Sequence, residues 1–283
     1  MDPDDSETEQ APSPTLKSSI LTVAFTACYL YSNQTVQLSH LSKSATKELP
    51  VKETRASAPV KKRKTIYLTF DDGPNKGTAN VLHIINEEEM PSTFFLVGEH
   101  VYGSSLQKAE FDSLLKSKFV EIANHSYTHA FHNHFSRFYQ VPDSAARDFI
   151  RCADSLGFKN KIIRLPGRNI WRTATVTYTD IPATSRFADS IYQKGFIEMG
   201  WDLEWRFNNN LSLINTEDEM LQQIDSAFAQ NRTKTKENLV LLAHDQVFAD
   251  STDAGMLHHF IQKLKQKDEY DFETVNKYPG LKN

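Results

Sequence analysis

Two acidic residues, Asp71 and Asp72, stand side by side where an apolar run, residues 66–70, ends in a Gly-Pro turn. Further along, a second largely apolar run, residues 119–123, is followed by His125 and His129. Histidines four residues apart share one face of a helical turn, so both rings can reach one ligand. Two imidazoles and a carboxylate suit a divalent transition metal. If the two segments meet in the fold, the sequence therefore predicts a metal site.

The composition indicates a globular protein whose function depends on a localised site. The 283 residues, 39% hydrophobic and 11% aromatic, suffice for a substantial core. A formal net charge of −4 gives no general attraction to polyanions, so we expect no nucleic-acid partner, and we expect a monomer. Two cysteines, Cys28 and Cys152, exclude a disulfide framework and a cysteine-ligated zinc site, and Cys152 is expected to be a buried apolar residue.

The first sixty residues differ in composition from the rest. We expect residues 1–60 to be a disordered extension, with an apolar segment at about 18–31 followed by a polar linker, and residues 61–283 to be the folded domain. The apolar segment is shorter than the roughly 20 residues of a spanning helix and resembles the core of an export signal. This predicts an exported protein, periplasmic, extracellular or tethered to a membrane. The acidic residues that precede the segment favour the alternative, a buried or interfacial helix.

From residue 65 onward, strand-like runs alternate with amphipathic helical patterns. Strands are predicted at residues 65–70, 93–97, 119–123, 161–164, 196–201, 238–243 and 271–275. Helices are predicted at residues 78–89, 104–117, 143–156, 185–194, 216–230 and 255–267. Such alternation is typical of a parallel sheet, and seven repeats favour a barrel over an open sheet. We therefore predict an α/β fold, a distorted (β/α)7 barrel.

The position of the polar residues strengthens the case for a site, because each motif alone is weak: Asp-Asp-Gly-Pro is good turn material, and ten histidines form pairs by chance. Seven polar residues come at or just after the carboxyl ends of predicted strands: Asp71, Asp72, His125, His129, Arg164, Asp202 and His244. In a β/α barrel these ends converge on one face, where active sites are built.

With these segments in hand, residues 65–279 resemble the polysaccharide deacetylases of the NodB-homology type, carbohydrate esterase family 4. The motifs that carry the resemblance are Thr69-Phe70-Asp71-Asp72-Gly73-Pro74, Pro91-Ser92-Thr93-Phe94-Phe95-Leu96-Val97-Gly98, His125-Ser126-x-x-His129 and Leu241-Leu242-Ala243-His244. The resemblance implies a NodB-type barrel and makes residues 61–283 a polysaccharide deacetylase catalytic domain. The implied reaction removes N-acetyl groups from an amino-sugar polymer or oligosaccharide, such as peptidoglycan or chitin.

The resemblance also implies a role for each motif residue. Asp72, His125 and His129 would hold a divalent metal, most often Zn²⁺, with Co²⁺, Ni²⁺ and Mn²⁺ as alternatives. Asp71 would be the catalytic base that takes a proton from the attacking water. His244 would donate a proton to the leaving amine.

Two further residues would tune Asp71 and His244. Arg164 would keep Asp71 ionised and oriented, and Asp202 would raise the pKa of His244. A backbone N–H after Arg164 would stabilise the oxyanion.

Two motifs depart from the family pattern. The third usually carries a tyrosine where this chain has Gly167, so the groove wall must differ. The fourth offers Glu204 with compressed spacing, which leaves open whether Asp202 or Glu204 tunes His244. We expect four residues to contact the substrate: Gly167, Arg168, Trp201 and Trp205.

Three alternative functions remain open. An O-acetyl carbohydrate esterase would use the same chemistry. A noncatalytic carbohydrate-binding protein could keep the fold, with the altered third and fourth motifs as its only support. A non-haem iron oxygenase also uses two histidines and a carboxylate, but its carboxylate commonly follows the first histidine by two residues, where this chain has Tyr127.

Overall fold

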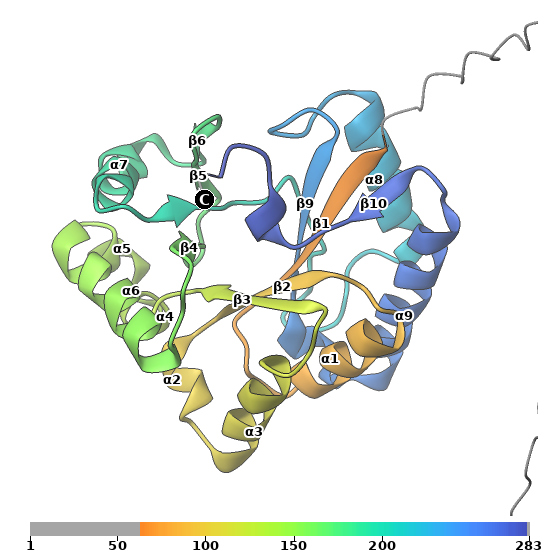
Figure 1. The fold of residues 1–283 in the computed structure, drawn as a ribbon, viewed down its shortest axis with the longest axis horizontal. Helices are drawn as coiled ribbons and strands as arrows, with labels where there is room; N and C mark the ends of the chain where they lie inside the picture. Colours follow the sequence, from red (N-terminus) through yellow and green to blue (C-terminus); the bar gives the residue numbers. More distant parts are fainter. Residues whose placement is uncertain (1–62, 282–283) are drawn as a thin grey trace, which may run out of the picture. The chain divides into compact units, whose positions relative to one another are not determined.

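The centre of the fold is a parallel strand pair, β1 (Lys64–Asp71) and β9 (Asn238–His244), seen in Figure 1. The computed structural model describes residues 63–281, so the predicted extension, residues 1–60, lies outside the described part of the chain. Six of the eight residues of β1 are buried, as expected of a central strand with packing on both faces. The register sets Asp71 opposite His244, so both strands end at the same edge.

A ten-stranded sheet extends from this pair, in the order β6-β5-β7-β4-β3-β2-β1-β9-β8, with β10 also paired to β1. The pairs are parallel except where β5 joins β6 and β7. The strands besides β1 and β9 are β2 (Ser92–Leu96), β3 (Val120–Asn124), β4 (Ile162–Ile163), β5 (Ile170–Arg172), β6 (Thr177–Thr179), β7 (Ile197–Glu198), β8 (Leu203–Glu204) and β10 (Tyr270–Phe272). This curled sheet confirms the predicted distorted barrel, and all seven predicted strands form, several of them shortened.

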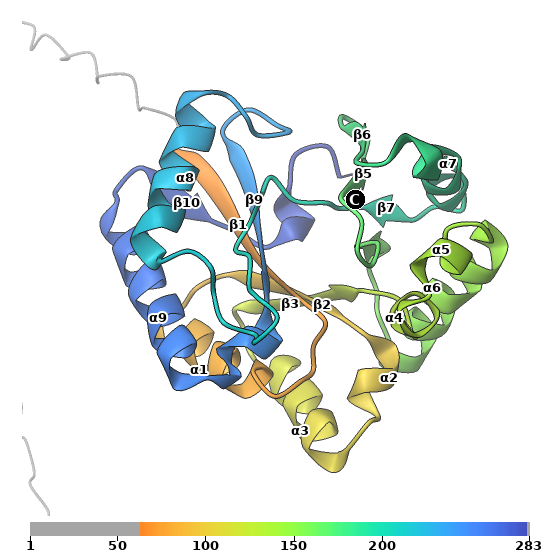
Figure 2. The ribbon, with the colours of Figure 1, turned by 180° about the vertical axis from the view of Figure 1, so that it is seen from behind.

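Helices surround the outside of the sheet (Figure 2). They are α1 (Thr78–Glu87), α2 (Gly98–Val101), α3 (Ser105–Leu114), α4 (His129–Asn133), α5 (Phe135–Phe138), α6 (Pro142–Leu156), α7 (Ser185–Gln193), α8 (Glu217–Ala229) and α9 (Ser251–Gln266), with 3₁₀ turns at Pro182–Thr184, Asp245–Ala249 and Val275–Lys277. All six predicted helices form. Helix α8 shows why: Thr216 and Glu219 cap its start reciprocally, and one stripe of it is buried.

The main core lies between the sheet and the outer helices. It contains Cys152, which is fully buried as predicted, and Trp205, which is fully buried against Phe248 and Phe260. Packing in this core fixes the strands whose ends carry the polar residues.

Within residues 63–281, every helix is too short or too polar to cross a membrane.

Candidate metal and catalytic centre

The carboxyl ends of the strands meet as predicted and form a pocket of about 320 Å³. Asp71 ends β1, His244 ends β9, and His125 directly follows β3. The residues that line the pocket come from segments far apart in the sequence: Asp71, Asp72, His125, His129, Phe135, Gly167, Trp201, Glu204, Leu242 and His244. A larger cavity, about 660 Å³, lies near Lys161 and Phe196 before β4 and β7, and none of the predicted site residues lines it.

Three side chains have the geometry of a metal site. Asp72 Oδ1 lies 3.3 Å from His125 Nε2 and 3.2 Å from His129 Nε2. Ligand atoms at about 2.0–2.2 Å from a tetrahedral zinc are about 3.3–3.6 Å apart, which is close to these two distances, so the trio suits such an ion. Asp72 Oδ1 is buried and accepts no hydrogen bond from residues 63–281, although a buried carboxylate oxygen needs a partner. In the described part of the chain, this is the only group of three or more such side chains that could hold a metal.

The electrostatics of the trio favour a cation. Burial raises the pKa of Asp72, but the neighbouring His125 and His129 rings outweigh burial and hold that pKa well below its usual value. Asp72 is therefore anionic at neutral pH, as a carboxylate ligand of a metal must be. Three protein ligands leave coordination positions open, which is typical of a catalytic rather than a structural site.

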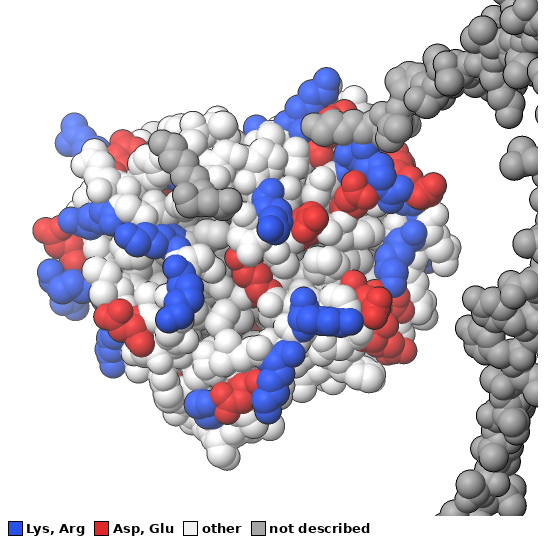
Figure 3. All heavy atoms as spheres, in the orientation of Figure 1, with Lys and Arg blue, Asp and Glu red and all other residues white. Residues whose placement is uncertain are grey.

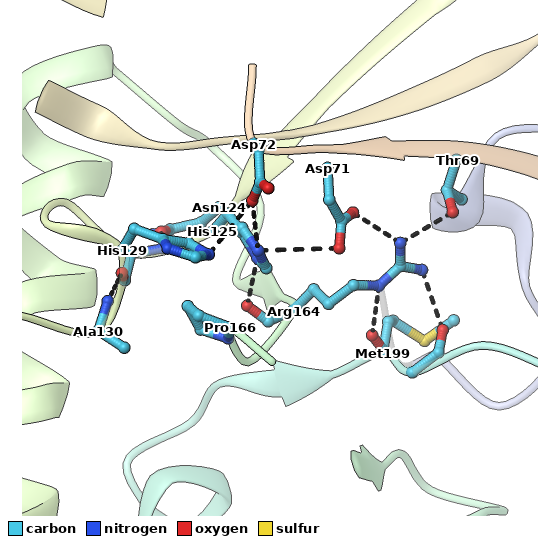
Figure 4. Close-up of polar contacts among 12 residues, drawn as sticks. Thr69, Asp71, Asp72, Asn124, His125, His129, Ala130, Arg164, Pro166 and Met199 are labelled. Atoms are coloured by element: carbon cyan, nitrogen blue, oxygen red, sulfur yellow. Dashed lines mark hydrogen bonds and ion pairs between the residues drawn. The ribbon is translucent and has the colours of Figure 1, made fainter. Parts of the chain in front are cut away.

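The two histidines reach Asp72 by a route that the sequence did not predict. His125 and His129 do not share a helical turn: β3 ends at Asn124, Ser126 takes φ 68°, and His129 opens a separate turn. The other ring nitrogens have their own partners. His125 Nδ1 donates to the carbonyl oxygen of Arg164 over 2.9 Å, so its Nε2 faces Asp72 (Figure 4).

Asp71 is oriented by a buried guanidinium. Arg164 is fully buried and donates from Nη1 to Asp71 Oδ1 and to Thr69 Oγ1, each over 2.8 Å. Its Nε and Nη2 donate to the carbonyl oxygens of Met199 and Gly200 over 3.0 and 2.9 Å (Figure 4). These bonds leave Asp71 Oδ2 free of Arg164 and 3.8 Å from His125 Nε2, beside the metal trio. The predicted pairing of Arg164 with Asp71 is present.

Neighbouring side chains stabilise the turn that carries both aspartates. Asp72 has φ 76°, and its carbonyl oxygen accepts from His100 Nδ1 over 2.7 Å. The carboxylate of Asp245 is fully buried and accepts from the Thr78 hydroxyl over 2.5 Å. A side chain at Gly73 would place its Cβ 2.5 Å from Asp245 Oδ2 and would displace that buried carboxylate.

The expected pairing of Asp202 with His244 is not formed. Asp202 precedes β8, and its carboxylate accepts from the backbone N–H groups of Lys234 and Val240 over 2.7 and 2.8 Å. Val240 lies four residues before His244, or about 13 Å along the strand. Within residues 63–281, His244 Nδ1 has no hydrogen-bond partner. Glu204, in contrast, lies opposite Leu242 and lines the pocket with His244.

Comparisons with known proteins agree with this geometry. The sequence model of the polysaccharide deacetylase family matches residues 58–180. A peptidoglycan-N-acetylglucosamine deacetylase from Bacillus cereus is 30% identical over 243 residues, which cover 81% of this chain and 77% of that protein. This chain belongs to the polysaccharide deacetylase family.

Two further relatives extend the comparison. A chitin disaccharide deacetylase from Vibrio alginolyticus is 24% identical over 308 residues, covering 76% of this chain and 71% of that protein. The crystal structure of a polysaccharide deacetylase from Bacillus cereus matches with a TM-score of 0.51 at 25% identity, covering 77% of this chain and 94% of that one. The resemblance inferred from the motifs is therefore confirmed.

The residues expected to contact substrate in this deacetylase fold divide into two groups. Gly167 and Trp201 line the pocket. Trp205 was wrongly predicted, because its ring is fully buried in the core and its Nε1 donates to the carbonyl oxygen of Asn215 over 2.8 Å. Arg168 lies outside the residues that line the pocket, and its Nη1 donates to the carbonyl oxygen of Gly167 over 2.7 Å.

Three residues of the site were not predicted from the sequence. Leu242 lines the pocket beside His244, and Thr69 binds Arg164. Each stands two residues before a predicted catalytic residue on the same strand, so the period of two could have revealed both. The third, Phe135, lines the pocket, and its ring lies 3.1 Å from where a Cβ on Gly167 would stand. No sequence pattern signalled that contact.

Proposed function

We propose that this protein is a metal-dependent N-deacetylase that acts on an amino-sugar polymer or oligosaccharide of the peptidoglycan or chitin type. The observation that carries the proposal is one pocket in which a metal-type trio lies beside an independently held carboxylate. Asp72, His125 and His129 fit the ion, while Asp71 is bound to Arg164 and stays available as a base. Family membership supports the deacetylase reaction, and this geometry supports its metal dependence.

Each side chain has a distinct task in the proposed reaction. A divalent cation held by the trio would supply the positive charge that polarises an acetamide carbonyl and makes water acidic enough to attack it. Asp71 accepts the water proton at Oδ2, because its Oδ1 is held by Arg164. The N–H of Gly167 has no acceptor within residues 63–281 and is available to an oxyanion in the pocket.

The leaving group requires a proton from the other side of the pocket. His244 ends β9 opposite Asp71 and lines the same pocket, so an acid and a base flank the reacting carbonyl. His244 donates to the leaving amine, which yields acetate and a free amino sugar. Phe207 packs edge to face on the His244 ring, with centroids 5.1 Å apart, and limits its rotation.

An uncharged carbohydrate fits the surface and the pocket walls. On the face drawn in Figure 3, basic and acidic side chains are interspersed rather than gathered into a patch of one sign. Trp201 and Phe135 give the pocket apolar walls that suit the apolar faces of a sugar and its acetyl methyl group. The named relatives act on peptidoglycan N-acetylglucosamine and on a chitin disaccharide, which supports the same substrate class here.

The test is acetate release from three substrates, with and without a metal chelator. We expect release from peptidoglycan or N-acetylated chitin oligomers that stops on chelation and returns when zinc is added back. Release from acetylated xylan alone would favour an O-acetyl esterase instead. Sugar binding with no release from any substrate, by protein shown to contain metal, would refute the catalytic proposal.

A further inference from the structure

The segment that follows His129 winds left-handed. Five consecutive residues, His129–Asn133, have φ between 46° and 66°, and none of them is glycine. Non-glycine residues rarely adopt this conformation, and asparagine tolerates it best among those present here. Left-handed winding over a whole turn places Asn133 beside His129, and Asn133 Oδ1 accepts a hydrogen bond from His129 Nδ1.

Other side chains hold this turn without help from Asn133. Ser126 Oγ accepts from the N–H of Ala130 over 3.1 Å, and Thr128 Oγ1 accepts from the N–H of Phe131 over 3.0 Å. Asp148, on α6, accepts in turn from the Thr128 hydroxyl and from the Thr128 N–H, each over 3.1 Å. The side chain of Asn133 is exposed and, among residues 63–281, bonds only to His129. The Asn133 side chain therefore orients the His129 ring and is not needed to hold the turn.

The hydrogen bond from His129 Nδ1 to Asn133 Oδ1 decides which nitrogen of His129 faces Asp72. An imidazole that donates from Nδ1 carries its lone pair on Nε2, the atom 3.2 Å from Asp72 Oδ1. His125 obtains the same support from a backbone carbonyl, that of Arg164, which no side-chain substitution removes. His129 depends on a side chain that lies outside every motif of the family resemblance.

We propose that Asn133 is a positioning residue for the metal site, which sets the tautomer and orientation of His129 and thereby raises the affinity for the ion. This inference rests on the proposed function, because His129 is assigned there as a ligand. Partners of metal-bound histidines typically contribute about 10- to 100-fold to metal affinity, and the exposure of Asn133 places it at the lower end.

The experiment measures the zinc dissociation constant by competition with a chromophoric chelator, so that catalysis is not needed. Asn133→Gly removes the acceptor and fits φ 66° better than asparagine does, so it introduces no backbone strain. Asn133→Asp keeps an acceptor and makes it anionic, which strengthens the bond to the ring. The matched control is Asn231→Gly, at another exposed asparagine with φ 51° that is not part of the pocket.

We expect Asn133→Gly to bind zinc about tenfold more weakly, Asn133→Asp to bind at least as tightly as wild type, and Asn231→Gly to match wild type. The d–d absorption of the cobalt-substituted protein should change in Asn133→Gly and not in Asn231→Gly. Wild-type affinity in Asn133→Gly, or equal weakening in both Asn133 variants, would overturn the role of Asn133 alone. A wild-type protein that binds no metal would instead overturn the proposed function and this inference with it.

Discussion

Replacing Asp202 and Glu204 separately should show which acid serves His244. Asp202 lies at the level of Val240 and binds two backbone N–H groups, whereas Glu204 lines the pocket. Asp202→Asn should therefore alter stability and leave kcat within about twofold of wild type. Glu204→Gln should lower kcat by at least about tenfold, because it removes the only carboxylate other than Asp71 and Asp72 among the residues that line the pocket.

The stability change of Asp202→Asn has two parts of opposite sign. The amide NH₂ cannot accept one of the two N–H bonds, which costs about 1–3 kcal/mol. Against this, burial raises the pKa of Asp202 to about 6, and bonds from Val240 and Lys234 only partly offset it. Relative to about 3.9 in the unfolded chain, this shift disfavours the ionised folded state by roughly 3 kcal/mol above pH 6.

The sign of the pH dependence follows from this shift. A raised folded pKa gives wild type stability that is fully present below about pH 4 and is lost as the pH rises through about 6. Asp202→Asn should thus be less stable than wild type at pH 4 and close to it at pH 7.5. Chemical denaturation at both values and acetate release at pH 7.5 check this. A folded Asp202→Asn with little turnover, beside an active Glu204→Gln, would refute the assignment.

Three further predictions concern single residues. Asp71→Asn should retain bound metal and lose most turnover, whereas His125→Ala should lose both; equal metal loss in the two variants, measured by elemental analysis, would reject the division into base and ligand. Trp205→Ala should lower the free energy of unfolding by about 3–5 kcal/mol, while Trp201→Ala should mainly raise KM, and the reverse pattern in denaturation and kinetics would contradict their placement. Burial raises the pKa of Glu198 to about 9, with Asp189 adding to this and Arg172 opposing it, so wild type loses stability from about pH 4 to 9. Between pH 5 and 8, Glu198→Gln should lose up to about 4 kcal/mol less free energy of unfolding than wild type. A substitution effect of the same size at pH 5 and at pH 8, measured by denaturation, would contradict this.

The sequence predicted the residues at strand ends because that prediction needs only the place where each strand stops. Asp71 directly follows an apolar run of five residues, and His125 comes one residue after a second, largely apolar run of five; such runs show where a strand ends even when its pairing is unknown. The alternation of strands and helices then predicted that these strand ends meet at one edge of the sheet. Short elements gave no such signal: β5, β6 and β8 span two or three residues, too few for any periodicity to be visible.

The wrong predictions concern where one strand begins and the handedness of one turn. The apolar pattern of residues 196–201 predicts one strand with Asp202 just after it, but the chain forms β7, breaks, and starts β8 after Asp202. Asp202 therefore lies beside Val240, four residues before the end of β9, instead of at the edge of the sheet with the pocket. Trp205 faces the core instead of the pocket.

The left-handed turn after His129 was hidden for a different reason. No glycine marks it, and its conformation is selected by contacts from Ser126, Thr128 and α6. A ligand on a strand end is specified locally, whereas the groups that orient it depend on packing between distant segments. Glu204 and Asn133 belong to that second class, so we expect proteins with the same motifs to differ in metal affinity and proton transfer when they differ at these two positions.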